Sequence, residues 1–261
     1  MLTFTIITCT YNAAAEIERT LESVRTQTYP NIQHVIIDGA STDGTVKMIQ
    51  DYQERCAYKD RSRSIMAISA KDHGLYDAMN KGLALTDGDY LVFLNAGDTL
   101  HSEDTIAKIA DQLTTCYKDK GEMPGVVYGK TDIVDDEGRF LHARRLKVPE
   151  KLTWRSFMNG MLVCHQAFYA KASIARQIKY NLKYRFSADV DWCIRVMKET
   201  EDRHLPLHNT HLTLCNYLEG GMSVKNHRAS LIERFRIMAK HYGIVQTSMM
   251  HLWFCVRRNG R

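Results

Sequence analysis

Residues 3–27, TFTIITCTYNAAAEIERTLESVRTQ, change their hydrophobic period part-way along, and this change decides the fold. Residues 3–8 are β-branched or aromatic at every position, which is typical of a buried strand. The residues that follow have helical spacing, with Ile17, Leu21 and Val24 on one face. The stretch therefore predicts a strand followed by a helix.

The same alternation continues through the first hundred residues. Further strands are predicted at 34–38, 64–70 and 89–94, and helices at 41–55 and 75–86. Near-continuous apolar strands separated by helices are typical of a parallel sheet that is covered on both faces. We therefore expect an α/β fold with a mostly parallel central sheet and helices on both faces.

The second half has a more mixed pattern. Residues 126–146 predict two strands around an Asp-Glu-Gly turn, and residues 189–199 and about 230–242 have helical spacing. No repeat, low-complexity tract or Pro/Gly/Ser linker divides the chain. One integrated domain is therefore expected.

Composition excludes several classes of protein. No window approaches 18 uninterrupted apolar residues, and the N-terminus lacks the features of a signal peptide, so we expect an intracellular, cytoplasmic protein. The seven cysteines form no C-x-x-C pair, which favours reduced thiols over disulfides or a zinc ribbon. The basic residues lack interleaved aromatics and a binding motif, so nucleic acid is not an expected partner.

In parallel sheets of this kind, ligands bind beyond the carboxyl ends of the strands. The polar residues predicted at those ends are Thr10, Tyr11, Asn12, Asp38, Asp72, His73 and the Asn95–Asp98 turn. Asp38 with Gly39 could accept hydrogen bonds from a base or ribose, and Asn95 with Asp98 could offer oxygen ligands to Mg²⁺ or Mn²⁺. The alternative is that both segments are simply turns closing strands.

Three segments in order resemble glycosyltransferase family 2: residues 5–45, residues 72–98 (DHGLYDAMNKGLALTDGDYLVFLNAGD) and residues 187–195 (SADVDWCIR). That resemblance implies the GT-A fold, a nucleotide-sugar donor and inversion. The segments LYDAMNKG, LNAGD and CHQAFYAK are most similar to those of the branch that builds bacterial capsule, exopolysaccharide or lipopolysaccharide.

The resemblance also implies roles for the strand-end residues. Those assigned to the nucleotide pocket are Thr10, Tyr11, Asn12, Asp38, Asp72, Gly74, Asn95 and Ala96. Asn95 and Asp98 lie where the family carries its D-x-D metal motif. Asn95 and Gly97 replace two of its carboxylates here, so a metal would depend more on the donor diphosphate and water.

The resemblance places the catalytic base at Asp189, six residues before Arg195, with Ala188 in place of the family's Glu. Inversion needs one carboxylate that takes the proton from the acceptor hydroxyl. Asp191 is the competing candidate, and its projection about 200° away on a helix means that the two cannot share the role. His165 and Gln166 match an acceptor-proximal loop, although His165 could equally be a hydrogen-bonded core residue.

The expected function is transfer of a sugar from a nucleotide-diphosphate donor to a hydroxyl of a surface glycan or lipid-linked acceptor. Residues 1–120 would bind the donor and residues 121–229 the acceptor, followed by basic amphipathic helices over 230–261. The segment 244–258 could rest on the inner face of the plasma membrane, pack on the domain or form a homodimer. The alternative function is a catalytically weak nucleotide-sugar-binding or scaffold protein.

Overall fold

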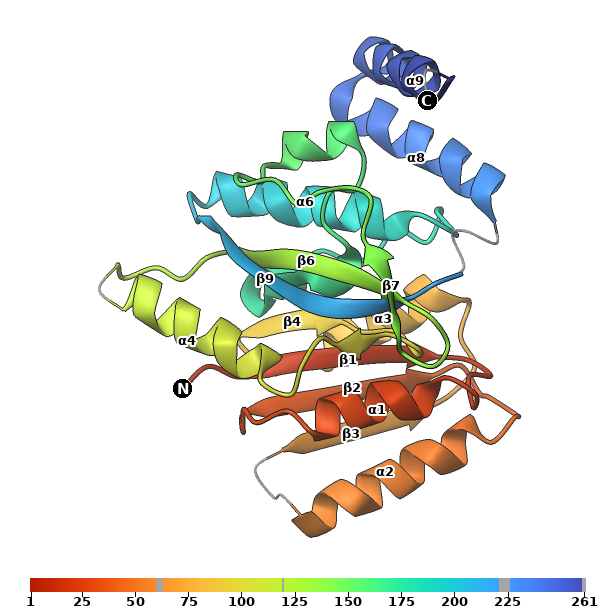
Figure 1. Cartoon of the computed structure of the whole chain (residues 1–261), viewed down its shortest axis with the longest axis vertical. Coiled ribbons are helices and arrows are strands. Elements are labelled where there is room, and N and C mark those ends of the chain that lie inside the picture. Colours follow the sequence, from red (N-terminus) through yellow and green to blue (C-terminus); the bar gives the residue numbers. More distant parts are fainter. Residues whose placement is uncertain (60–62, 119, 221–225, 260–261) are drawn as a thin grey trace.

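One sheet runs through the protein and joins its two halves. The computed structural model describes residues 1–59, 63–118, 120–220 and 226–259, and side-chain environments for all of these except 58–59 and 254–259. Within the described residues the sheet has nine strands in the order β3-β2-β1-β4-β8-β6-β9-β5, with β7 paired to β6. Figure 1 shows β3, β2, β1 and β4 stacked at one end and the C-terminal helices at the other.

The first four strands form a parallel unit. They are β1 (Phe4–Thr10), β2 (Ile32–Asp38), β3 (Ser64–Ser69) and β4 (Tyr90–Phe93). Every residue of β1, β2 and β4 is buried, as their apolar runs predict. The strand β3 is partly exposed because it lies at the edge of the sheet.

The second half of the sheet is mixed. Its strands are β5 (Thr99–Leu100), β6 (Val126–Val134), β7 (Phe140–Ala143), β8 (Phe168–Lys171) and β9 (Leu207–Leu218). The strand β8 runs antiparallel to β4 and β6, whereas β9 runs parallel to β6. The expected α/β fold is confirmed, but its mostly parallel character holds only for the first half.

Helices cover both faces of the sheet. Ile17, Leu21 and Val24 are buried, as predicted from their spacing. The helices α1 (Ile17–Arg25), α2 (Thr45–Lys59) and α4 (Thr105–Tyr117) pack on one face, and α3 (Leu75–Ala84) and α6 (Ala188–Asp202) on the other. Between β7 and α6 lie η1 (Trp154–Asn159), η2 (His165–Ala167) and α5 (Ala172–Ala175).

The chain closes with α8 (His227–Tyr242) and α9 (Ile244–Asn259). The helix α8 confirms the predicted basic helix and begins three residues earlier than expected. It packs on α6 and η1, and both helices form the end of the molecule beyond α6 in Figure 1. Across the described ranges, no helix combines the length and hydropathy that crossing a membrane requires.

Candidate functional site

The predicted nucleotide-binding residues gather where the parallel strands end. Thr10 lies in register beside Asp38, and Asp38 beside Ser69. The Leu94 N–H donates to the Ile7 carbonyl at 2.9 Å, which brings the end of β4 beside β1. We call this edge the strand-end rim; it comprises Thr10, Tyr11, Asn12, Asp38, Asp72, Gly74, Asn95 and Ala96.

The loops after β1 and β2 hold each other in a fixed arrangement. The Asn12 N–H donates to Ser41 Oγ at 2.8 Å, and Asn12 Oδ1 accepts from the Thr42 N–H at 2.9 Å. Asn12 and Ala40 have φ angles of 48° and 63°, in the left-handed region that side chains rarely adopt. Backbone strain of this kind is found mainly at functional sites, where the surrounding structure maintains it.

The two acidic residues of the rim, Asp38 and Asp72, differ in environment. Asp38 is buried and accepts hydrogen bonds from the Ser41 N–H at 2.9 Å, the Ser41 hydroxyl and the Ser69 hydroxyl at 2.6 Å. Asp72 is partly exposed and accepts from the Gly74 N–H at 2.8 Å. A Cβ on Gly39 would lie 2.9 Å from Asp72 Oδ2, so glycine permits this close approach.

Two polar atoms at the rim have no partner within the residues that the structure describes. They are Thr10 Oγ1 and Asn95 Oδ1, and both are buried. Thr10 ends β1, and Asn95 lies just after β4. Because buried polar atoms in proteins are nearly always hydrogen-bonded, these two are the strongest local indication of a missing ligand.

The structure explains why glycine replaces a carboxylate at position 97. Gly97 has φ = 94°, and its N–H donates to Thr20 Oγ1 at 2.9 Å. A Cβ there would lie 2.7 Å from Leu218 Cδ2 on β9. An aspartate would be strained in this conformation and would have to displace Leu218.

Asp98 is engaged by the protein itself. Its Oδ1 accepts from the Leu218 N–H at 3.0 Å and its Oδ2 from Gln166 Nε2 at 2.7 Å. Burial raises the pKa of Asp98 to about 7, although both hydrogen bonds lower it. Its carboxylate joins β9 and η2 to the turn after β4.

The residues predicted to bind a divalent cation, Asn95 and Asp98, do not form a cation site on their own. Each Asp98 oxygen already accepts one hydrogen bond, whereas Asn95 Oδ1 has no partner within the described residues. Among the described residues, no three His, Cys, Asp or Glu side chains gather in a way that could hold a metal ion.

The residues predicted to lie near the acceptor, His165 and Gln166, are both buried. His165 Nε2 lies 2.7 Å from the Tyr180 hydroxyl, and its ring stacks on Phe93 with 5.0 Å between centroids. Burial lowers the pKa of His165 to about 4. Its environment is that of a hydrogen-bonded core residue, the alternative considered from sequence, and contact with an acceptor remains a prediction.

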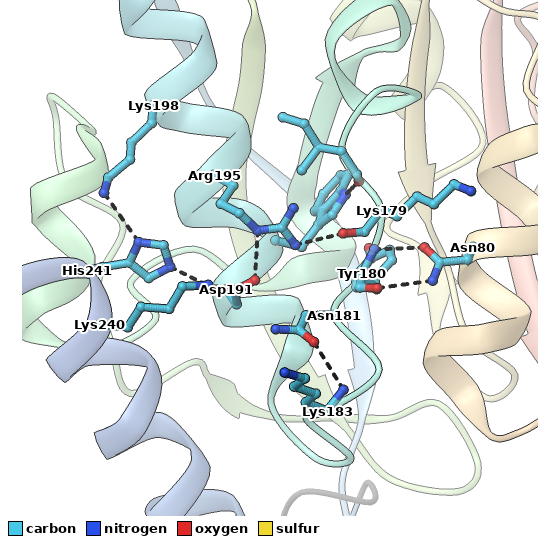
Figure 2. A network of polar contacts seen from close by, with 12 residues as sticks. Asn80, Lys179, Tyr180, Asn181, Lys183, Asp191, Arg195, Lys198, Lys240 and His241 are labelled. Atoms are coloured by element: carbon cyan, nitrogen blue, oxygen red, sulfur yellow. Dashed lines mark hydrogen bonds and ion pairs between the residues drawn. The ribbon is translucent and has the colours of Figure 1, made fainter.

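The two candidate bases on α6 have opposite environments. Asp189 is partly exposed and accepts a hydrogen bond from the Tyr76 hydroxyl at 3.1 Å. Asp191 is fully buried and accepts from Arg195 Nε at 2.7 Å and from His241 Nε2 at 2.8 Å (Figure 2). Burial alone would raise the pKa of Asp191, but the His241 hydrogen bond and the Arg195 charge hold it well below its usual range. The geometry therefore favours Asp189 as the base and speaks against Asp191, whose carboxylate has no surface to offer an acceptor.

Three residues that contact the first turn of α6 or the segment before it were not predicted from the sequence. Tyr76 stands within the LYDAMNKG motif but was not singled out. Glu233 is the one acidic residue from 225 onward in the sequence, and nothing in its local sequence indicates a partner near residue 186. His241 carries no local signal, because its partner Asp191 is 50 residues away in the chain.

Comparison with known proteins gives the same family along most of the chain. The family model described as Glycosyl transferase family 2 matches residues 5–178. A "PGL/p-HBAD biosynthesis glycosyltransferase" of Mycobacterium tuberculosis is 31% identical over 222 residues, which cover 84% of this chain and 78% of the relative.

Solved structures share the fold at low identity. S. aureus TarS 1-349 in complex with UDP-GlcNAc superposes with a TM-score of 0.69 at 15% identity and covers 91% of this chain. The chain spans 64% of the length of that TarS fragment. A mannosyltransferase, PcManGT from Pyrobaculum calidifontis in complex with GDP-Man and Mn²⁺, has a TM-score of 0.62 at 16% identity, covering 95% of this chain and 74% of its own.

Proposed function

Because the chain belongs to glycosyltransferase family 2, we propose that it transfers a sugar from a nucleotide-diphosphate donor to an acceptor hydroxyl with inversion. The donor would lie across the strand-end rim. The acceptor would approach from the side of α6. Both solved structures named above hold nucleotide sugars, which supports a donor of this class.

The observation that carries this proposal is the contact between Asp189 and Tyr76. Tyr76 lies in the first turn of α3, two residues after Gly74 of the rim. Its hydroxyl donates to Asp189 at 3.1 Å, which supports a position for this carboxylate beside the proposed donor site. A partly exposed carboxylate in this position can accept the proton of an acceptor hydroxyl as that oxygen attacks the anomeric carbon.

The rim supplies the donor contacts in this proposal. Thr10 Oγ1 and Asn95 Oδ1, which lack partners within the described residues, would bond the donor. Mg²⁺ or Mn²⁺ is proposed only as a companion of the donor diphosphate, near Asn95. We assign it no step in catalysis, since both Asp98 oxygens already accept hydrogen bonds from the protein.

The C-terminal helices support an acceptor at an anionic lipid surface. On α9 the side chains of Ile244, Val245, Met249 and Leu252 are 57–70% exposed, and residues 244–253 carry no charge. The neighbouring α8 carries four Lys/Arg against Glu233. Val256, which was predicted to continue this apolar face, and Arg257 and Arg258, which follow it, lie outside the described side chains. Co-sedimentation with vesicles containing anionic lipid, but not with neutral vesicles, would support this contact; equal behaviour in both would exclude it.

The test of the proposed function combines donor binding with turnover. UDP-, GDP-, dTDP- and CMP-sugars are screened by thermal shift, each with Mn²⁺ and with EDTA, and the stabilising donor is assayed for nucleotide release. Asp189→Asn should keep the thermal shift and lose at least about a hundredfold in rate, the usual contribution of a general base. Donor binding without turnover in the unmodified protein would instead support the scaffold alternative, and the EDTA arm decides whether a cation is needed.

A further inference from the structure

The helix α8 is attached to the segment that leads into α6. Glu233 accepts from the Arg185 N–H at 2.7 Å and from the Phe186 N–H at 2.8 Å. One turn earlier, Ser230 Oγ lies 2.9 Å from Ser187 Oγ, and both serines are buried. Three consecutive residues before α6 are thus bonded to α8.

These bonds take the place of an ordinary helix cap. Ser187 is the N-cap residue of α6, yet its side chain makes no capping hydrogen bond to the helix. A serine at this position usually accepts from a backbone N–H of the first turn. Here its hydroxyl is directed to Ser230 instead, so the start of α6 is held by α8 rather than by its own cap.

A second attachment lies four residues further along α6. Asp191 accepts from His241 Nε2 at 2.8 Å, and Lys240 Nζ lies 3.4 Å away. The Lys198 ammonium can only donate, so its 3.3 Å contact with His241 Nδ1 makes that nitrogen the acceptor. The ring proton is therefore on Nε2, where it faces Asp191.

The same network reaches the helix that carries Tyr76. Arg195 bonds Asp191 through Nε and the Lys179 carbonyl through Nη2 at 2.8 Å. The next residue, Tyr180, exchanges two backbone hydrogen bonds with the Asn80 side chain of α3, at 2.7 and 3.1 Å (Figure 2). Asp191 thereby connects α8, α6 and α3.

Asp189 lies between the two attachments, and its carboxylate accepts a hydrogen bond from the Tyr76 hydroxyl. We propose that α8 fixes the orientation of Asp189, with Glu233 and His241 as positioning residues that never touch the substrate. This rests on the proposed role of Asp189 as the base. Proton transfer and nucleophilic attack are sensitive to displacements of about 1 Å, so loosening the first turn of α6 should slow turnover without weakening donor binding.

The test replaces His241 in the full chain. His241→Ala should lower kcat for nucleotide release by about tenfold or more, with the KM for the donor selected by thermal shift changed less than about twofold. His241→Gln can still donate to Asp191 from its amide and should restore most of the rate. Glu199→Gln, which changes an exposed carboxylate paired with Arg203 at the far end of α6, is the matched control and should behave as the unmodified protein.

Two further measurements make the proposal falsifiable. In an Asp189→Asn background, His241→Ala should cause no additional loss of rate, because it acts through Asp189. Amide hydrogen exchange over residues 185–191 should be faster in His241→Ala and near normal in His241→Gln, whether or not turnover is detected. An additive loss of rate or unchanged exchange overturns the positioning role. An Asp189→Asn variant with full activity would overturn the proposed base itself.

Discussion

The strand-end rim and the junction between α6 and α8 both concentrate polar side chains, but they treat them in opposite ways. At the rim, Thr10 Oγ1 and Asn95 Oδ1 are buried without partners among the described residues. At the junction, the fully buried Asp191 is bonded by Arg195 and His241, with Lys240 nearby. The rim has two partnerless buried oxygens, whereas the buried carboxylate at the centre of the junction has several donors.

This difference indicates which of the two regions is suited to bind a ligand and which is suited to hold the helices in place. A buried polar atom without a partner costs free energy that a ligand can recover. A buried carboxylate with several donors is held in one position. Removing one partner costs free energy of folding, because the remaining buried groups are left without a partner. The comparison therefore supports the proposals that the rim contacts the ligand and that the junction positions α6.

The largest change in stability is expected at the junction between α6 and α8. Asp191→Ala should lower the free energy of unfolding by about 3 kcal/mol, because it leaves Arg195, Lys240 and His241 without their anion. The matched change Glu199→Ala removes an i,i+4 pair of the same spacing on the same helix, but that pair is exposed and should cost less than about 0.5 kcal/mol. Urea unfolding of the two variants measures both values. Equal costs would mean that burial gives the Asp191 network no special weight.

Much of the fold was predictable because hydrophobic period alone specifies buried strands and amphipathic helices. The run at 3–8 and the spacing of Ile17, Leu21 and Val24 predicted the strand β1 and the helix α1 correctly. In the second half the two strands within 126–146 and the helices α6 and α8 were also predicted. The strand pairing was not, because β8 pairs with β4 and β6 across long sequence separations. Strand direction there follows from tertiary packing, which period does not encode.

The candidate site, like the fold, could be predicted only in part from the sequence. The strand-end positions could be predicted, since the carboxyl ends of parallel strands meet at one edge. The environment of each side chain could not. Asp98 has the residue type of a metal ligand, but the Leu218 N–H and Gln166, 120 and 68 residues away, occupy its oxygens. Asp189 was favoured over Asp191 from the position of Arg195, but the burial of Asp191 and its bond to His241 of α8 could not be predicted from local sequence.

A smaller effect is expected at His165, which lies between the two regions against Phe93 and Trp192. Its pKa is lowered to about 4 by burial, so the folded protein keeps the ring neutral while the unfolded chain protonates near pH 6.5. Stability is therefore lost as the pH falls from about 6.5 towards 4, by about 2 kcal/mol between pH 7 and pH 5.

His165→Gln removes this titration. Two other buried groups titrate in the unmodified protein: His34, with its pKa lowered to about 3, adds to the loss on acidification, and Asp98, with its pKa raised to about 7, opposes it. Both are retained in the variant, so the difference between the two pH profiles isolates His165. Parallel profiles from urea unfolding at pH 5, 6 and 7 would show that His165 is protonated or solvated in the folded protein.

The smallest effect separates binding from stability at the rim itself. Thr10→Val removes a buried hydroxyl that has no partner among the described residues, so the unfolding free energy should stay constant or rise by about 1 kcal/mol. Thr8→Val is the matched control on the same strand: Thr8 Oγ1 lies 3.0 Å from His34 Nε2, and its loss should cost about 1 kcal/mol. Donor affinity, measured by calorimetry, should fall several-fold in Thr10→Val and remain unchanged in Thr8→Val.

The opposite outcome would be a Thr10→Val variant that is destabilised as much as Thr8→Val and binds donor normally. The unpaired hydroxyl would then be satisfied by water, and the proposal that the rim is the ligand-binding region would be contradicted. If instead only Thr8→Val is destabilised and only Thr10→Val binds donor more weakly, the Thr10 hydroxyl is a group that bonds the donor.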